Sequence, residues 1–204
     1  MVGIPGIMKM NKLLKQVLLV CVCLFTLTGQ AIADSLSDAN RAYDAGKYVK
    51  AAKLFKPLAE HGDAGAQTNL GLMYDQGKGV PRDYKEAVKW FRLAAKNGYA
   101  PAQSRLGDMY FNGRGVLRDY KEAVQWFRLA AENGYVPAQS RLGDMYQNGL
   151  GVPKNYVFAQ MWKNIAAANA PTGELKQLKQ LTLQQIAEAQ ELARKCTANK
   201  FKGC

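Results

Sequence analysis

The side chains able to do chemistry in this 204-residue chain are few and scattered. His61 is the single histidine, and it stands beside Gly62 at the end of a helical pattern, where capping is its expected role. No group of His, Cys, Asp or Glu has the spacing of metal ligands, and no nucleophile has an evident base partner. We therefore expect no catalytic residue, no metal and no cofactor.

A second set of polar residues recurs at a fixed interval. Arg105 and Asp108 reappear 36 residues later as Arg141 and Asp144. Arginines at such an interval can engage carboxylates along an extended ligand. Each arginine also stands three residues before an aspartate, a spacing that allows solvated ion pairs within one helix. The two aspartates are expected about 10 Å apart, judged from helix packing, which is too far to share a proton.

The interval of 36 residues extends through much of the chain. Residues 65–100 and 101–136 are identical at 25 of 36 positions without a gap, and residues 137–152 match 101–116 at 14 of 16. A fixed period of this length is typical of stacked helical hairpins. The sequence therefore predicts an all-α repeat array and a binding surface.

Each repeat contains two helical patterns separated by a glycine-rich turn. In the second repeat, Leu106, Gly107 and Tyr110 share one face of the first helix, and Gly107 allows a neighbouring helix to approach closely. Asp119 is placed to cap the second helix, with Glu122 completing a capping box. Large aromatic residues recur once per repeat, which predicts core packing; they are Trp90, Trp126, Trp162, Phe91 and Phe127.

The pattern Ala-x-x-x-Leu-Gly-x-x-Tyr-x-x-Gly-x-Gly-Val-x-x-Asp-Tyr-x-x-Ala-x-x-Trp-x-x-x-Ala-Ala-x-x-Gly resembles the Sel1-like repeat, a relative of the tetratricopeptide repeat. The resemblance covers about residues 65–170 and implies a right-handed α-solenoid of stacked helical hairpins. It departs in the third unit, where Asn155 and Lys163 replace Asp119 and Phe127. We therefore expect the second helix of that unit to begin a terminal cap.

The regions outside the repeats have their own patterns. Aromatic and alanine positions 36 residues before those of the first repeat indicate a degenerate, tetratricopeptide-like hairpin. Thr182 and Gln185 form a second capping box before a final amphipathic pattern, which is suited to cover the open end of the stack. The predicted organisation is a signal peptide at 1–33, a degenerate hairpin at 34–64, repeats at 65–100, 101–136 and 137–170, and capping helices with a tail at 171–204.

The two best-matched repeats differ at five positions inside the first helix, and all five share one helical face. The opposite, unchanged face is expected to pack against neighbours. In arrays that resemble tetratricopeptide repeats, first helices line the concave groove where partner peptides lie, and Asn and basic residues there hold a peptide's terminal carboxylate. The resemblance implies a groove lined by Asn69, Leu72, Asp75, Ser104, Arg105, Asp108, Phe111, Arg141, Asp144 and Gln147.

The N-terminal segment reads as a secretory signal peptide. Three lysines precede the apolar run 17–27, and Ala31 and Ala33 provide the small residues that favour cleavage after Ala33. The run is shorter than the roughly 20 residues of a membrane span. A lipidation site at Cys21 or Cys23 is the weaker alternative, because valine precedes each. We therefore expect a periplasmic or secreted protein.

Removal of residues 1–33 would take three lysines and no carboxylate, lowering the net charge from +12 to +9. Two cysteines would remain, Cys196 and Cys204. An even number in an exported chain suggests one disulfide closing a short C-terminal loop, and two free thiols are the alternative.

These features favour a non-catalytic adaptor that binds another protein or peptide. Some secreted Sel1-like proteins are described as penicillin-binding or weak β-lactamases, but those carry a disulfide in every repeat, and this chain also has no Ser-x-x-Lys motif. Basic residues spread over the second helices suggest weak association with anionic glycan or envelope surfaces as another alternative. They form no stripe with stacking aromatics, which argues against nucleic acid.

Overall fold

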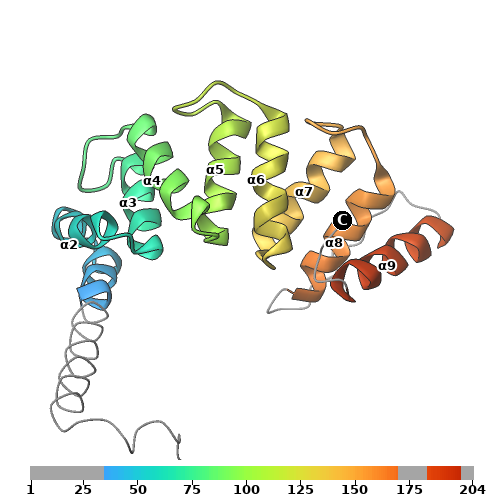
Figure 1. Cartoon of the computed structure of the whole chain (residues 1–204), viewed down its shortest axis with the longest axis horizontal. Coiled ribbons are helices and arrows are strands. Elements are labelled where there is room, and N and C mark those ends of the chain that lie inside the picture. The colour runs from blue at the N-terminus through green and yellow to red at the C-terminus, as the bar shows by residue number, and fades with distance from the viewer. Residues whose placement is uncertain (1–34, 170–182, 199–204) are drawn as a thin grey trace, which may run out of the picture.

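The computed structural model describes residues 35–169 and 183–198, and within these ranges every regular element is a helix. Consecutive helices pack against one another, so the described part of the chain is an arched stack of hairpins in chain order (Figure 1). The predicted all-α solenoid is therefore confirmed. A helix at residues 35–44 precedes α2 (Tyr48–Glu60), α3 (Ala64–Gln76), α4 (Tyr84–Lys96), α5 (Ala100–Asn112), α6 (Tyr120–Glu132), α7 (Val136–Asn148), α8 (Tyr156–Asn169) and α9 (Leu183–Ala198).

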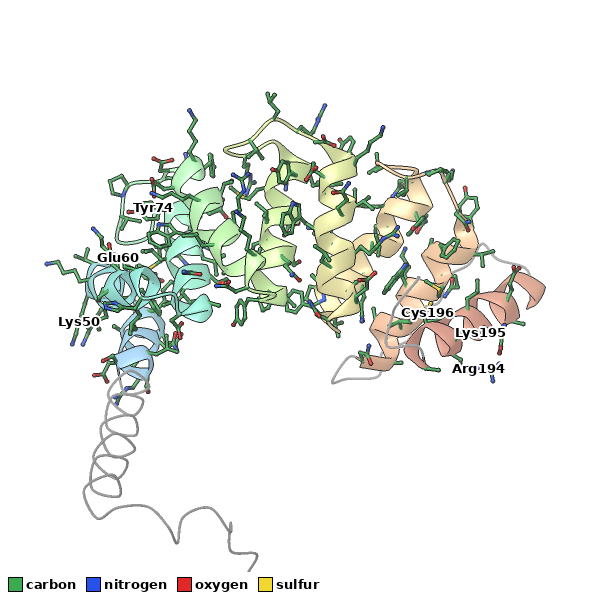
Figure 2. The ribbon with its side chains drawn as sticks, in the orientation of Figure 1. Lys50, Glu60, Tyr74, Arg194, Lys195 and Cys196 are labelled. Atoms are coloured by element: carbon green, nitrogen blue, oxygen red, sulfur yellow. The ribbon has the colours of Figure 1, made fainter. Side chains whose placement is uncertain are left out.

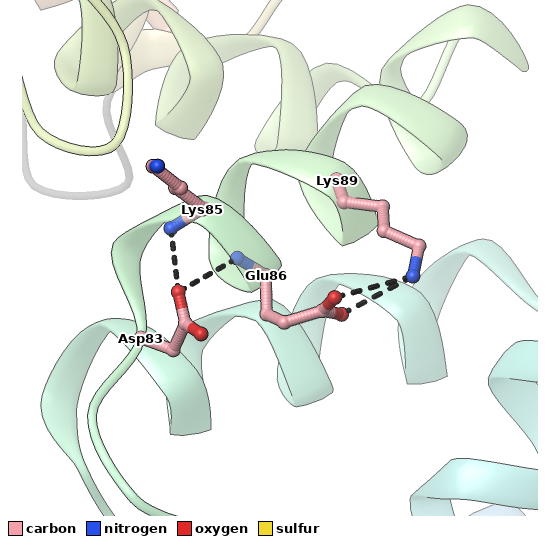
Figure 3. A network of polar contacts seen from close by, with 4 residues as sticks. All are labelled: Asp83, Lys85, Glu86 and Lys89. Carbon is pink, nitrogen blue, oxygen red and sulfur yellow. Dashed lines mark hydrogen bonds and ion pairs between the residues drawn. The ribbon is translucent and has the colours of Figure 1, made fainter.

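Helices α4 and α6 each begin after an aspartate that caps them. Asp83 Oδ1 accepts hydrogen bonds from the second and third backbone N–H groups of α4 at 2.9 and 3.1 Å (Figure 3), and Asp119 does the same for α6. The predicted capping box is wrong in its second half. The Asp119 N–H donates to the Tyr110 carbonyl at 3.0 Å, so it is not available to Glu122.

A glycine in the first helix of each repeat brings the two helices of the hairpin together. Gly107 lies against the ring of Phe127, which is fully buried. A Cβ at position 107 would lie 2.8 Å from Phe127 Cε1, closer than real Cβ atoms approach. The same contact recurs in the first repeat, whereas in the third repeat Gly143 meets the side-chain stem of Lys163.

Neighbouring repeats are joined by a buried hydrogen bond and a backbone contact. Gln103 Nε2 donates to the Ala95 carbonyl at 3.2 Å, and equivalent glutamines repeat this bond at the junctions on either side. Gly115, with φ of +70°, lies so close to the Tyr84 carbonyl that a Cβ would be 2.3 Å from its oxygen. Both contacts fix how one hairpin stacks on the next, and this stacking positions the first helices.

The recurrent aromatic residues form the core, as predicted. Phe91, Phe127 and Trp162 are fully buried, and Trp90 is 9% exposed. Trp126 is partly buried and packs against the cluster that contains Phe91. These positions explain the aromatic residues by packing, with no ligand required.

The two ends of the described stack are covered differently. The helix at residues 35–44 and α2 share a core with α3, and α9 packs on α8. Cys196 is buried, with its Sγ 3.6 Å from Met161 Sδ of α8, whereas Arg194 and Lys195 are exposed (Figure 2). Cys204, Thr182 and the predicted signal peptide lie outside the described residues.

None of the helices in the described ranges combines the length and the apolar composition that crossing a bilayer requires.

Candidate binding groove

The residues predicted to line the groove lie on α3, α5 and α7 and differ in accessibility. Ser104 is only 5% exposed and therefore offers no surface, although its equivalent Ser140 is exposed. Arg105 and Arg141 are exposed. Of the others, Asp144 is exposed, and the half-buried ones are Asn69, Leu72, Asp75, Asp108, Phe111 and Gln147.

Two of these polar side chains are engaged by neighbouring elements. Asn69 Nδ2 donates to Asn40 Oδ1 of the N-terminal hairpin at 3.1 Å. Gln147 Oε1 accepts a hydrogen bond from Lys163 Nζ of α8. Neither residue is therefore as open to a ligand as the repeat pattern alone suggests.

The ion pairs of this face run between elements and not within one helix. Arg141 Nε of α7 lies 3.5 Å from Asp108 Oδ1 of α5, and Arg114 Nη1, in the turn after α5, lies 3.8 Å from Asp75 Oδ1 of α3. Asp144 pairs with Lys163 Nζ at 2.8 Å. The spacing-based alternative of i,i+3 pairs at 105–108 and 141–144 is therefore wrong.

Arg105 has neither an ion pair nor a hydrogen bond to any residue in the described part of the chain. Nearby, burial raises the pKa of Asp108, while the positive charges of Arg141, Arg105 and Arg114 act to lower it. Asp108 Oδ1 is buried and accepts no hydrogen bond. The ion pair with Arg141 Nε, at 3.5 Å, is its contact with a cation. The centre of this face is thus a half-buried group of charges with incomplete pairing.

These charges line a pocket of about 310 Å³ between α3, α5 and α7, which we call the charged pocket. Its lining combines the buried Phe91 of α4 with three arginines and two aspartates. The complete lining is Asp75, Phe91, Arg105, Asp108, Met109, Asn112, Arg114 and Arg141.

A second pocket of about 220 Å³, which we call the apolar pocket, adjoins it through Arg141. Seven of the eight positions of the charged pocket, each shifted by 36 residues, make up the apolar pocket. Two of the seven differ in character, since Phe111 replaces Asp75 and Leu150 replaces Arg114. The complete lining is Phe111, Phe127, Arg141, Asp144, Met145, Asn148 and Leu150.

Residues 64–99, 100–135 and 136–170 each match the Sel1 repeat, and together they make up about half of the chain. This protein belongs to the Sel1 repeat family. Each match starts one residue before the unit delimited from the sequence. The third Sel1 match extends through α8, so the helix expected to begin a terminal cap is part of the third repeat. Asn155 accordingly caps α8, since its Oδ1 accepts from the Phe158 N–H at 3.0 Å.

Solved structures of other Sel1 proteins have the same fold. The protein c5321, a protective antigen present in uropathogenic Escherichia coli strains, is 39% identical with a TM-score of 0.65; the match covers 69% of this chain and 31% of c5321. A Sel1 repeat protein from Oxalobacter formigenes is 34% identical with a TM-score of 0.63, covering 67% of this chain and 55% of its own. This chain thus spans about a third of the length of c5321 and about half of the length of the Oxalobacter formigenes protein. No curated protein matches the chain.

The Sel1 repeat is generally a non-catalytic scaffold, and its repeats typically mediate protein interactions. Within the described ranges, no group of three or more His, Cys, Asp or Glu side chains is arranged to hold a metal ion. His61 lies at the C-terminal end of α2, where its ring nitrogen is 2.7 Å from the Pro57 carbonyl. This agrees with the capping role expected from the sequence.

Eight of the residues that line the two pockets were not predicted for the groove: Phe91, Met109, Asn112, Phe127, Met145 and Asn148 lie in helices, and the other two are Arg114 and Leu150. Both stand in the glycine-rich turn after the first helix, a segment explained by turn geometry alone. A signal was present, because this position is Lys78, Arg114 and Leu150 in successive repeats while its flanking glycines do not change. Variation at a turn position between invariant glycines indicated a side chain free to serve binding.

Proposed function

We propose that this protein is a non-catalytic scaffold of the cell envelope that binds another protein or peptide through the groove formed by α3, α5 and α7. The observation that carries the proposal is Arg105, an exposed guanidinium at a ligand-sized pocket with no partner among the described residues. Arginine is enriched at binding hot spots, where it makes charge-assisted, two-point contacts with carboxylates. The family, whose members often serve as protein-interaction scaffolds, supports the same conclusion.

The envelope location rests on the predicted signal peptide at residues 1–33. The E. coli relative is described as a protective antigen, and this agrees with an exported protein. Export would place the groove among envelope proteins, and the basic surface would add weak attraction to anionic components of the envelope.

The test is affinity capture from an envelope extract with protein produced from the full-length chain in a bacterial host. The groove variant is Arg105→Glu/Arg141→Glu. The matched control, Lys85→Glu/Lys121→Glu, makes the same change in net charge on exposed residues of α4 and α6. We expect a protein that is held by the parent and the control and lost by the groove variant.

The other outcomes are equally informative. Equal capture by all three proteins would contradict the groove assignment. Loss of capture with both variants would favour the alternative, in which the basic surface attracts anionic glycan or lipid. Turnover of a chromogenic β-lactam by the parent, abolished by a single substitution, would contradict the non-catalytic assignment.

A further inference from the structure

The charged pocket and the apolar pocket are formed by equivalent positions of successive repeats, but two of those positions change from charged to apolar residues. Five positions are shared: the buried phenylalanine, the arginine, the aspartate, the methionine and the asparagine. The remaining pair is Asp75 with Arg114 in the first pocket and Phe111 with Leu150 in the second. An ion pair across one pocket is thus replaced by an apolar pair across the next.

The charged pocket has an excess of cationic groups. Three guanidiniums face two carboxylates, and the two pairings that exist, at 3.5 and 3.8 Å, are too long for hydrogen bonds. Arg105 has no partner in the described ranges. One further carboxylate would allow each of the three guanidiniums to pair with a carboxylate, and it would accept hydrogen bonds from N–H groups that now have no acceptor. Charge complementarity therefore favours an anionic group here.

The apolar pocket offers a different environment. Its lining includes Phe127 and Met145, which are at most 2% exposed, and the partly buried Phe111 and Leu150. The one acid of its lining, Asp144, is already paired with Lys163 at 2.8 Å. An apolar side chain entering this pocket would remove hydrocarbon from water on both sides of the contact, a favourable change.

The two pockets share Arg141, and consecutive first helices are about 10 Å apart, judged from helix packing. An extended polyproline-II segment advances about 9 Å in three residues and returns its side chains to the same face. We propose that the groove recognises an extended peptide that places a carboxylate side chain in the charged pocket and a large apolar side chain, three residues away, in the apolar pocket. This inference rests on the groove-binding function proposed above.

The probe is a set of fluorescent nonapeptides, acetylated and amidated so that no terminal charge remains. The parent peptides carry Glu and Leu three residues apart, in both orders, in a Gly/Ser/Ala background. Control peptides replace Glu by Gln, replace Leu by Ser, or place the two side by side. We expect each control to bind about tenfold more weakly than the better parent order, which is the size of effect expected for losing a charged hydrogen bond or a buried leucine.

Protein variants assign each effect to its pocket. Arg105→Gln should reduce the preference for Glu over Gln about tenfold and leave the preference for Leu over Ser unchanged. Phe111→Asp/Leu150→Arg rebuilds in the apolar pocket the ion pair of the charged pocket. That variant should change the preferred second side chain from Leu to Glu. Thermal unfolding checks the fold, and Leu150→Arg alone, which should abolish the preference for Leu, serves if the double variant does not fold.

The outcomes separate this inference from the proposed function. Peptides with Glu and Leu that bind no better than their controls would overturn the inference. If the groove variant still failed to capture an envelope protein that the parent captures, the proposed function would stand without this inference. Peptide preferences unaffected by Arg105→Gln and by the Leu150 variants would likewise overturn it, because the site would then lie elsewhere. Preferences altered as stated support both pocket assignments.

Discussion

Arg141 Nε lies 3.5 Å from Asp108 Oδ1, so the second and third repeats meet in an ion pair at a side chain that lines both pockets. The side chains of both residues retain contact with solvent, with 53% of Arg141 and 25% of Asp108 exposed. Such a pair adds little to stability by itself, about 0 to 1 kcal/mol. Its importance lies in holding the arginine between the two pockets.

Asp108 is expected to make the folded state less stable as pH rises. Burial raises its pKa above the ordinary value of 3.8, so the folded chain binds the proton more tightly than the unfolded chain. Stability therefore falls as pH increases through the interval between the two pKa values and stays lower above it. We expect Asp108→Asn to have a higher melting temperature than the parent at pH 7, with the difference shrinking toward pH 4. Circular dichroism melts across this range measure it, and a less stable variant at pH 7 would contradict the argument.

Gly107→Ala is expected to destabilise the stack by about 1–3 kcal/mol, the cost of overpacking a well-filled core. The new Cβ would lie 2.8 Å from the buried ring of Phe127. Gly65→Ala is the comparison, because a Cβ there would meet no ring but only Asp63 Oδ1, at 3.2 Å, the atom that caps α3 by accepting from the Ala66 N–H. Denaturant unfolding should show a larger loss in the free energy of unfolding for Gly107→Ala than for Gly65→Ala. Equal effects would mean that the hairpins can open to admit a methyl group.

Asp119→Ala should cost about 1 kcal/mol, because two backbone N–H groups at the start of α6 would lose their acceptor. In the third repeat Asn155 already fills the same role, so Asn155→Asp should change the free energy of unfolding by no more than a few tenths of a kcal/mol. Urea titrations of both variants provide the comparison. If Asp119→Ala left the free energy of unfolding unchanged, the hydrogen bond from the backbone N–H of residue 119 to the Tyr110 carbonyl would be sufficient to fix the start of α6.

Expression of the full chain in a bacterial host is expected to yield a protein cleaved after Ala33. When this protein is denatured without a reducing agent, we expect it to show no reactive thiol. The residues around Ala33 predict the cleavage, and an exported chain left with Cys196 and Cys204 predicts the disulfide. Intact mass and thiol titration measure both. A species lipidated at Cys21 or Cys23 would contradict the cleavage site, and two reactive thiols would contradict the disulfide.

Much of the fold could be predicted because its determinants are local and repeat. The 36-residue period predicts the hairpins, the aspartates predict where the second helices start, and the glycine at position 107 predicts a close contact that the structure places against Phe127. The reciprocal half of the capping box was wrong because the Asp119 N–H meets the Tyr110 carbonyl, a contact set by how the turn folds back on α5.

The repeat, its helices and the face on which the repeats differ could all be predicted from the sequence, because these features follow from the spacing of residues along one chain. Which charges pair depends on the stacking of the hairpins, since Arg141 pairs with Asp108 of the preceding repeat and not with Asp144 of its own helix. The same stacking buries Ser104 and brings Arg114 and Leu150 to the pockets. These contacts could not be predicted because the stacking of one hairpin on the next sets the distances between side chains of different repeats, and the spacing of residues within one helix does not determine those distances.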